Sequence, residues 1–431
     1  MRRITHWGIR RILRLWNKME RMRKLLSLPC FIFFVLAASC APLDLETPLT
    51  PVTQIPFFAS ETPPPIIVPV TETPSIILPG SETPPFIVPA TETPAPLPVT
   101  QWWEVYFTDP LTINDPNNPA GSVEERLIQF INSAQASIHI ASFEFNLPRV
   151  ADALIAAKAR GVDVRWVTDD EYGLEIDGNE NRGQFTRLMA GGIEVKDDAG
   201  RSALMHNKFW IFDRQIVWTG STNITVNGIY KQNNNVIVFR SPEIAAIYER
   251  EWEELWNGQL GPRAPSTRNN QWTILEGTPI QVLFSAEDDA VDNLIALVND
   301  AQTSIRFLAF SFTDYPLAQA MIARAQAGVD VQGVFETFGS NGLRSELRTL
   351  WCAGLPVRQD GNSSFLHDKV IVIDSSIVVT GSLNFSSSAD EENEENVVVL
   401  DNAGIAALYL QEYQKIWEQA NSLPAGAFTC E

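Results

Sequence analysis

Residues 206–223 read HNKFWIFDRQIVWTGSTN, and residues 367–384 read HDKVIVIDSSIVVTGSLN. In both stretches the order is His, one residue, Lys, four residues, Asp, six residues, Gly-Ser, one residue and Asn. The polar residues keep this spacing, whereas most of the apolar residues between them differ. The repetition indicates two copies of one unit, each of which supplies half of a single functional site.

The repeat extends well beyond these two stretches. AQASIHIASFEF at 134–145 matches AQTSIRFLAFSF at 301–312, and the separation between the copies is slightly smaller at the stretches quoted above. The second copy therefore lacks a few residues where the first has EYGLEIDGNENRGQ. Aromatic residues then recur every four positions in both copies, which is typical of the buried face of a helix. They are Tyr248, Trp252 and Trp256 in the first copy, and Tyr409, Tyr413 and Trp417 in the second.

Each copy alternates helical and strand patterns. An amphipathic helix, over 122–134 or 288–301, precedes an apolar strand, a second helix and a second strand. The runs KFWIFD and KVIVID are near-continuous apolar strands that end at an aspartate turn. Alternation of this kind predicts the α/β class, with helices that cover a sheet in each copy.

The spacing of His and Lys places two kinds of chemistry together. His206 and Lys208 are two residues apart in a strand, as are His367 and Lys369, so each pair projects to one side. Imidazole can act as nucleophile or general acid near neutral pH, while Lys and Asn donate to phosphoryl oxygens. A single His near a Lys is usually structural, but these two occupy equivalent places in two repeats. A third histidine, His139, has an arginine as its counterpart, and we predict no catalytic role for it.

This spacing resembles the HxKx4Dx6GSxN signature of the phospholipase D superfamily, which occurs here twice in full. The resemblance covers about residues 103–420. It implies two homologous α/β sandwich halves related by a pseudo-twofold axis, with one active site at their interface. It also implies that one histidine attacks phosphorus to form a phosphohistidine while the other protonates the leaving alcohol, without a metal or other cofactor.

The resemblance assigns roles to the residues of both motifs. His206 and His367 are the implied catalytic histidines, and Asp213 and Asp374, at the strand turns, are implied supports of the motif. The residues implied to hold the phosphoryl oxygens are Lys208, Lys369, Asn223 and Asn384, with Ser221 and Ser382 beside them.

The two copies differ at one position that bears on the histidines. Superfamily members often carry a Glu in an Asn-rich segment after the motif, where it orients a histidine. NEEN places Glu395 there in the second copy, whereas NNNV places Asn234 there in the first. A neutral amide can orient an imidazole but cannot stabilise its cation as a carboxylate does. The first histidine is usually the nucleophile in two-motif relatives, which favours His206, but this asymmetry leaves the roles of His206 and His367 open.

The N-terminal sequence is typical of a secretion signal. Positions 1–40 contain nine Lys or Arg and a single acid, and the apolar run from Leu25 to Ala38 ends in LAASC. This run is shorter than the roughly 20 residues of a membrane span. Small residues before Cys40 resemble the lipobox of bacterial lipoproteins, in which this cysteine is lipidated. Plain secretion and an uncleaved anchor are the alternatives, and a start at Met22 would leave a more compact signal.

Residues 41–101 have a different composition from the rest of the chain. ETPPPIIVP, ETPSIILPG and ETPPFIVPA follow one another, and such Pro-rich sequence favours an extended spacer. The export expected for the chain would allow Cys352 and Cys430 to form a disulfide, although two cysteines do not establish that they meet. The predicted parts are a signal over 1–40, an extended linker over 41–101, a first half over 102–262 and a second half over 263–431.

Charge and organisation bear on the substrate. The chain has 32 basic and 52 acidic residues, and removal of the nine bases and single acid of positions 1–40 leaves 23 and 51. Phosphate-rich polymers are bound mainly through clustered Lys and Arg, so this composition disfavours a nuclease. A cardiolipin synthase-like phosphatidyltransferase would be expected to have membrane spans before its motifs. A binding module on an inactive fold would be expected to have damaged motifs. We therefore predict a monomeric, exported and membrane-attached phosphodiesterase that acts on phospholipid headgroups, with nuclease and phosphatidyltransferase as alternatives.

Overall fold

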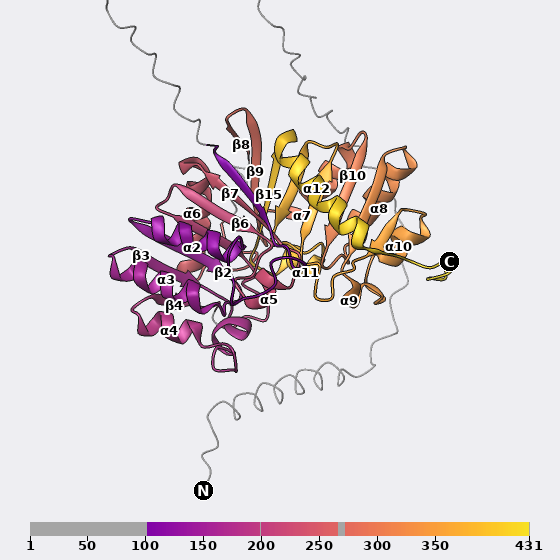
Figure 1. The fold of residues 1–431 in the computed structure, drawn as a ribbon. Coiled ribbons are helices and arrows are strands. Elements are labelled where there is room, and N and C mark those ends of the chain that lie inside the picture. The colour runs from indigo at the N-terminus through magenta and orange to yellow at the C-terminus, as the bar shows by residue number, and fades with distance from the viewer. Residues whose placement is uncertain (1–100, 199, 266–271, 431) are drawn as a thin grey trace, which may run out of the picture. The chain divides into compact units, whose positions relative to one another are not determined.

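The computed structural model describes residues 101–198, 200–265 and 272–430, which belong to one compact unit, Glu92–Glu431 (Figure 1). The predicted signal with Cys40, and the predicted linker up to residue 100, lie outside the described residues. Within the described ranges, no helix has both the length and the apolar character needed to cross a membrane.

The first half is built on a seven-stranded sheet. In order across the sheet, its strands are β1 (Trp103–Phe107), β7 (Asn235–Arg240), β6 (Ile216–Gly220), β5 (Lys208–Phe212), β2 (Ser137–Ser142), β3 (Asp163–Val167) and β4 (Glu194–Lys196). The helices are α2 (Val123–Ser133), α3 (Pro148–Ala159), a π-helix (Asp170–Leu174), α4 (Gln184–Ala190), α5 (Val226–Tyr230) and α6 (Pro242–Trp256). β2, β3 and β4 are mutually parallel, and the other neighbours are antiparallel.

The second half repeats this sheet and adds a strand at each edge. Its nine strands, in order, are β16 (Asn421–Ser422), β12 (Val357–Gln359), β11 (Asp330–Phe335), β10 (Ser304–Ala309), β13 (Lys369–Ile373), β14 (Ile377–Gly381), β15 (Glu395–Asp401), β9 (Thr278–Ser285) and β8 (Trp272–Leu275). The helices are α7 (Ala290–Asp300), α8 (Tyr315–Gln326), α9 (Thr337–Ser340), α10 (Leu347–Cys352), α11 (Ser387–Glu391) and α12 (Ala403–Gln419). The prediction of an α/β fold with two related halves is confirmed.

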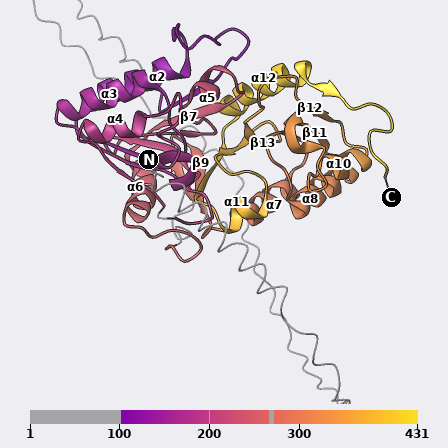
Figure 2. The same ribbon diagram turned by 90° about the horizontal axis from the view of Figure 1, so that it is seen from below.

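Helices cover both faces of each sheet, as Figure 2 shows for α2, α3 and α4 on one side of the first sheet and α6 on the other. Because both faces are covered, β5 and β13 are buried throughout, which explains their near-continuous apolar sequences. A central core joins the halves: Tyr248 of α6 and Tyr409 of α12 belong to one buried cluster. Both tyrosines are buried, which confirms the packing role predicted for them.

Local sequence signals set several element boundaries. The predicted helix at 122–134 is α2, and Ser122 caps it by accepting the backbone N–H of Glu125 at 3.1 Å. The predicted helix at 288–301 is α7, which begins at Ala290. Cys352, at the end of α10, forms a disulfide with Cys430, a pairing that the sequence left open.

Candidate active site

The first motif lies where β5 begins, and residues of the second half hold it there. The backbone N–H of His206 donates to the carbonyl oxygen of Glu394 at 2.9 Å. The His206 Nδ1 atom lies 2.7 and 2.8 Å from the two carboxylate oxygens of Glu395. The Lys208 ammonium donates to the His206 carbonyl oxygen at 2.7 Å. The structure therefore brings Glu395 to the histidine of the opposite half.

The second motif has the same arrangement with the halves exchanged. The backbone N–H of His367 donates to the carbonyl oxygen of Asn233 at 2.9 Å. Its Nδ1 atom lies 2.9 Å from Asn234 Oδ1 and 3.1 Å from the Ser221 carbonyl oxygen. The Lys369 ammonium donates to the His367 carbonyl oxygen at 2.7 Å. The pseudo-twofold relation thus places both motifs at one interface.

The partners of the two imidazoles determine which ring nitrogen can react. The Asn234 amide is oriented by its own contacts: Nδ2 donates to the Gly228 carbonyl oxygen at 3.0 Å, and Oδ1 accepts from Ser221 Oγ at 2.8 Å. Oδ1 therefore faces His367, and a carboxylate faces His206. Because both partners are acceptors, each Nδ1 carries the proton and each Nε2 has its lone pair available.

Burial dominates the electrostatics of the site. It lowers the pKa of His206 to about 4, although the carboxylate of Glu395 acts in the opposite direction. It also lowers the pKa of His367 well below its ordinary value, and both motif lysines add to this shift. Burial lowers the pKa of Lys208 to about 8 and that of Lys369 well below its ordinary value. An anion between these four groups would reverse the shifts, because opposite charge favours their protonated forms.

Two phenylalanines that the sequence analysis missed pack against the histidines. Phe143 contacts the His206 ring edge to face at 4.8 Å, and Phe310 contacts the His367 ring in the same way at 4.7 Å. The ammonium groups of both motif lysines lie 4.9 to 5.2 Å from the ring centroids of these two phenylalanines. The signal was available, because the two residues occupy matching places in the repeated segments at 134–145 and 301–312.

The predicted phosphate-binding residues have two kinds of environment. The side-chain carbonyl oxygens of Asn223 and Asn384 are buried and have no hydrogen-bond partner in the described part of the chain. The hydroxyls of Ser221 and Ser382 instead accept backbone N–H groups of β7 and β15, at 3.1 and 2.9 Å. The two asparagine oxygens thus lack a partner in the described residues, whereas the serines fix the strands beside the histidines.

The predicted supporting aspartates lie at the turns after β5 and β13. The Asp213 carboxylate accepts the backbone N–H groups of residues 135–137 at 2.6 to 3.1 Å. The Asp374 carboxylate accepts those of residues 302–304 at 2.7 to 3.0 Å. Both aspartates have positive φ angles, 53° and 52°. Asp213 therefore anchors the start of β2, which pairs with β5, and Asp374 anchors the start of β10, which pairs with β13.

Replacement of Asp374 by alanine is expected to lower the free energy of unfolding by about 2–4 kcal/mol, because three backbone donors lose a charged acceptor at a left-handed position. Asp374→Asn should cost less, since Asn tolerates that conformation. Urea unfolding followed by circular dichroism measures both effects. Loss of activity in either variant at unchanged stability would show that Asp374 takes part in the chemistry.

A second pair of residues, not predicted from the sequence, links the halves directly beneath the motifs. Asn235 donates through Nδ2 to Asp368 at 2.6 Å, and Asn396 donates through Nδ2 to Asn207 at 2.9 Å. The side-chain oxygen of each asparagine accepts a threonine hydroxyl of the opposite half at 2.7 Å. These bonds reach from β7 and β15 to the residue between His and Lys of the other motif, so they set the relative position of the motifs.

A third pair orients the chain just before each histidine. Asp169 accepts the backbone N–H of Met205 at 3.2 Å, and Glu336 accepts that of Leu366 at 2.6 Å. Burial raises the pKa of Asp169 to about 6 and that of Glu336 to about 7. Asp169 and Glu336 are separated by the same number of residues as the repeated segments at 134–145 and 301–312. The repeat in the sequence therefore already pairs these two acids.

Comparison with known proteins agrees with this geometry. The family model described as “Cardiolipin synthase, PLD-like domain” matches residues 127–256 and 294–417, more than half of the chain and one segment in each half. The chain belongs to the phospholipase D superfamily. This confirms the family resemblance on which the interpretation of the doubled motif was based.

Individual superfamily relatives cover parts of the chain. The mitochondrial cardiolipin hydrolase of Xenopus tropicalis is 33% identical over 132 residues, which are 31% of this chain and 63% of that protein. The match thus spans less than two thirds of that relative. A phospholipase D of Rickettsia bellii is 29% identical over 149 residues, 35% of this chain and 74% of its own. Phosphatidylserine synthase from Haemophilus influenzae Rd KW20 superposes with a TM-score of 0.55 at 14% identity, over 74% of this chain and 87% of its own, and shares the fold.

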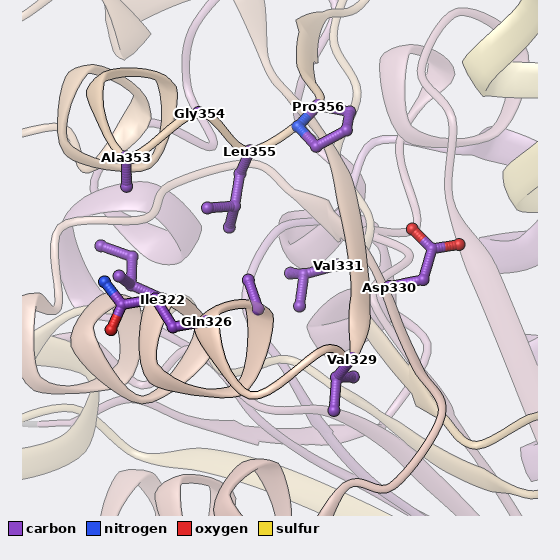
Figure 3. Close-up of a pocket in the computed structure, with 10 residues that line it drawn as sticks. Ile322, Gln326, Val329, Asp330, Val331, Ala353, Gly354, Leu355 and Pro356 are labelled. Carbon is purple, nitrogen blue, oxygen red and sulfur yellow. The ribbon is translucent and has the colours of Figure 1, made fainter.

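A pocket of about 430 Å³ adjoins the first motif of this phospholipase D-like chain. It is lined by Asn223 together with Glu144, Glu171, Tyr172 and Phe365, among others. The only basic residue that lines it in the described part of the chain is Arg182, which forms an ion pair with Glu144 at 3.2 Å. A separate pocket of about 340 Å³ lies between α8 and the segment that leads into β12, and no motif residue lines it (Figure 3).

Proposed function

We propose that this protein is a phosphodiesterase that hydrolyses the headgroup phosphodiester bond of phospholipids through a phosphohistidine intermediate. The observation that carries the proposal is the paired site: two buried imidazoles, each held at Nδ1 by an acceptor and each accompanied by a lysine of its own motif. Nucleophile and proton donor are thereby supplied by one chain.

The partners of the histidines support a division of labour. Glu395 faces His206, and a carboxylate stabilises the positive charge that an imidazole acquires when it bonds to phosphorus. His367 faces the neutral amide of Asn234, which makes its protonated form the stronger acid. We therefore assign attack on phosphorus to His206 and proton transfer to His367.

The reaction then proceeds in two displacements. In the first, His206 Nε2 bonds to phosphorus, the phosphorus–oxygen bond to the headgroup breaks, and His367 Nε2 gives its proton to the departing alcohol. In the second, water gives a proton to His367 and bonds to phosphorus, and the bond to His206 breaks. Lys208 and Lys369, with Asn223 and Asn384, would stabilise the phosphoryl oxygens during both steps.

The surroundings of the site support a phospholipid over a nucleic acid. Glu144 and Glu171 line the pocket beside Asn223, and its arginine is already paired. Such a wall would repel the phosphates that flank a cleavage site in DNA, whereas a phospholipid presents a single phosphodiester. The names of two similar proteins, a phospholipase D and a cardiolipin hydrolase, also favour a phospholipid substrate. The sequence of residues 1–40 supports export and attachment to a membrane through Cys40, which we include in the proposal.

The proposal predicts that full-length protein, offered phosphatidylcholine or phosphatidylglycerol vesicles and, separately, single- and double-stranded DNA, releases headgroup and leaves DNA intact. Both assays are run side by side with EDTA and with added CaCl₂. The expected headgroup release exceeds DNA cleavage by about 100-fold or more, because two pocket carboxylates oppose a polyanion. DNA cleavage without headgroup release would identify a nuclease and overturn the substrate assignment.

A further inference from the structure

A second group of acidic residues lies at the interface of the halves, apart from the two motifs. Glu251 and Glu254 come from α6 in the first half, and Glu287 follows β9 in the second. One carboxylate oxygen from each residue lies within 4.8 Å of the corresponding oxygens of the other two. Oxygens on opposite sides of a Ca²⁺ ion, each bonded at about 2.4 Å, are separated by about that distance. The three side chains thus converge as ligands of one ion would.

Each of these carboxylates has at least one buried oxygen with no hydrogen-bond partner in the described residues. Glu251 is 1% exposed, and its Oε2 atom has no hydrogen-bond partner. Oε2 of Glu254 and both carboxylate oxygens of Glu287 are also buried and unpartnered. Burial of a carboxylate is unfavourable unless a cation or hydrogen-bond donors offset it, so three buried carboxylates with unpartnered oxygens at one place require an explanation.

Further acidic residues add negative charge beside Glu251, Glu254 and Glu287. Glu394 and Asp288 lie close enough to Glu287 to act on it electrostatically. Glu287 and Glu394 likewise act on Glu251. The basic groups that face the cluster are Arg201, which is bonded to Glu394, and Arg250, which acts on Glu254. Neither forms an ion pair with Glu251 or Glu287 within the described ranges.

The second copy of the repeat shows what occupies the matching position there. In the register that aligns His206 with His367, Glu251 corresponds to Glu412, and Glu254 corresponds to Lys415. The Lys415 ammonium lies 2.7 Å from the Glu412 carboxylate, and Asp109 contributes a second negative charge nearby. The second copy therefore places a cation of its own where the first copy has another acid.

We propose that Glu251, Glu254 and Glu287 bind a divalent cation, calcium, which joins the two halves at the place where the second copy uses Lys415. An all-carboxylate set suits a hard cation, and Ca²⁺ accepts irregular oxygen geometry more readily than Mg²⁺, whereas Zn²⁺ prefers nitrogen or sulfur ligands. Because the ligands come from both halves, binding would stabilise their interface. This inference does not depend on the proposed phosphodiesterase activity.

The test measures calcium binding and thermal stability on full-length protein freed of metal with EDTA and then dialysed. Titration calorimetry with CaCl₂ should show one saturable site. The melting temperature should rise by about 3–6 °C at a hundredfold excess over Kd, since ligand binding to the folded state alone stabilises it. MgCl₂ should produce a smaller rise at equal concentration. Neither readout requires enzymatic turnover, so failure of the proposed function would not affect it.

Two variants distinguish a metal site from a general salt effect. Glu254→Lys copies the arrangement of the second half and should melt higher than wild type in EDTA, without responding to calcium. Glu287→Gln should remain folded, because one of the repelling charges is lost, and should bind calcium at least about tenfold more weakly. Absence of calcium heat and of any melting shift in the wild type would overturn the proposal. An equal calcium shift in wild type and both variants would also overturn it.

Discussion

Replacement of His206 or His367 by alanine is expected to reduce headgroup release by about 10⁴-fold or more in either case. The two imidazoles act in one reaction sequence, so removal of either stops turnover, and the double variant should be no slower than the single ones. Initial rates on phosphatidylcholine vesicles measure the effect. Radiolabelled phosphoryl group should be found on wild type denatured with SDS at alkaline pH, where the acid-labile histidine–phosphorus bond survives, and be absent from His206→Ala.

His139 provides a matched control for these substitutions. It is the third buried histidine of the described residues, but its Nδ1 atom contacts Glu249 at 2.6 Å and its ring stacks on Trp252 at 3.9 Å. His139→Gln should therefore lower stability while leaving the rate per folded molecule within about threefold of wild type. Near-normal release from His206→Ala or His367→Ala would contradict the shared site, and an equal loss from His139→Gln would show that the losses reflect folding.

The fold and the two motifs could be predicted from the sequence because both are indicated by local or repeated features. Apolar runs that end at Asp213 and Asp374 indicated buried strands, and the two identical spacings indicated a shared site. Glu395 was predicted only through the family resemblance, since nothing in its own segment indicates that it contacts His206. The structure places it there because β15 of the second half begins beside the first motif.

What the sequence analysis missed depends on how the two halves pack. Asn235 and Asn396 lie in Asn-rich segments after the motifs, but their partners are on the opposite half, and no local pattern specifies such pairing. The acidic cluster was missed for a different reason. The two copies differ there at Glu254 and Lys415, which lie between the aromatic residues at four-residue spacing, so the helical periodicity of the aromatic residues does not indicate the cluster.

Exchange of the acceptors that face the histidines is expected to separate their roles. Glu395→Gln should lower kcat by about 10²–10³-fold with little change in KM, because the amide cannot stabilise the cationic imidazole formed when His206 bonds to phosphorus. Asn234→Asp places a carboxylate beside His367 and should raise the pKa of that imidazole. The measurement is the pH dependence of kcat for wild type and both variants.

The direction of each pH shift follows from the assigned roles. His206 must be neutral to attack, so a lower His206 pKa in Glu395→Gln should move the acidic limb of the profile to lower pH. His367 must be protonated to release the alcohol, so a higher His367 pKa in Asn234→Asp should move the alkaline limb to higher pH. If Glu395→Gln moved the alkaline limb and Asn234→Asp moved the acidic one, His367 would be the nucleophile and His206 the acid. Such exchanged shifts would leave the paired site intact, because they concern only which imidazole bonds to phosphorus.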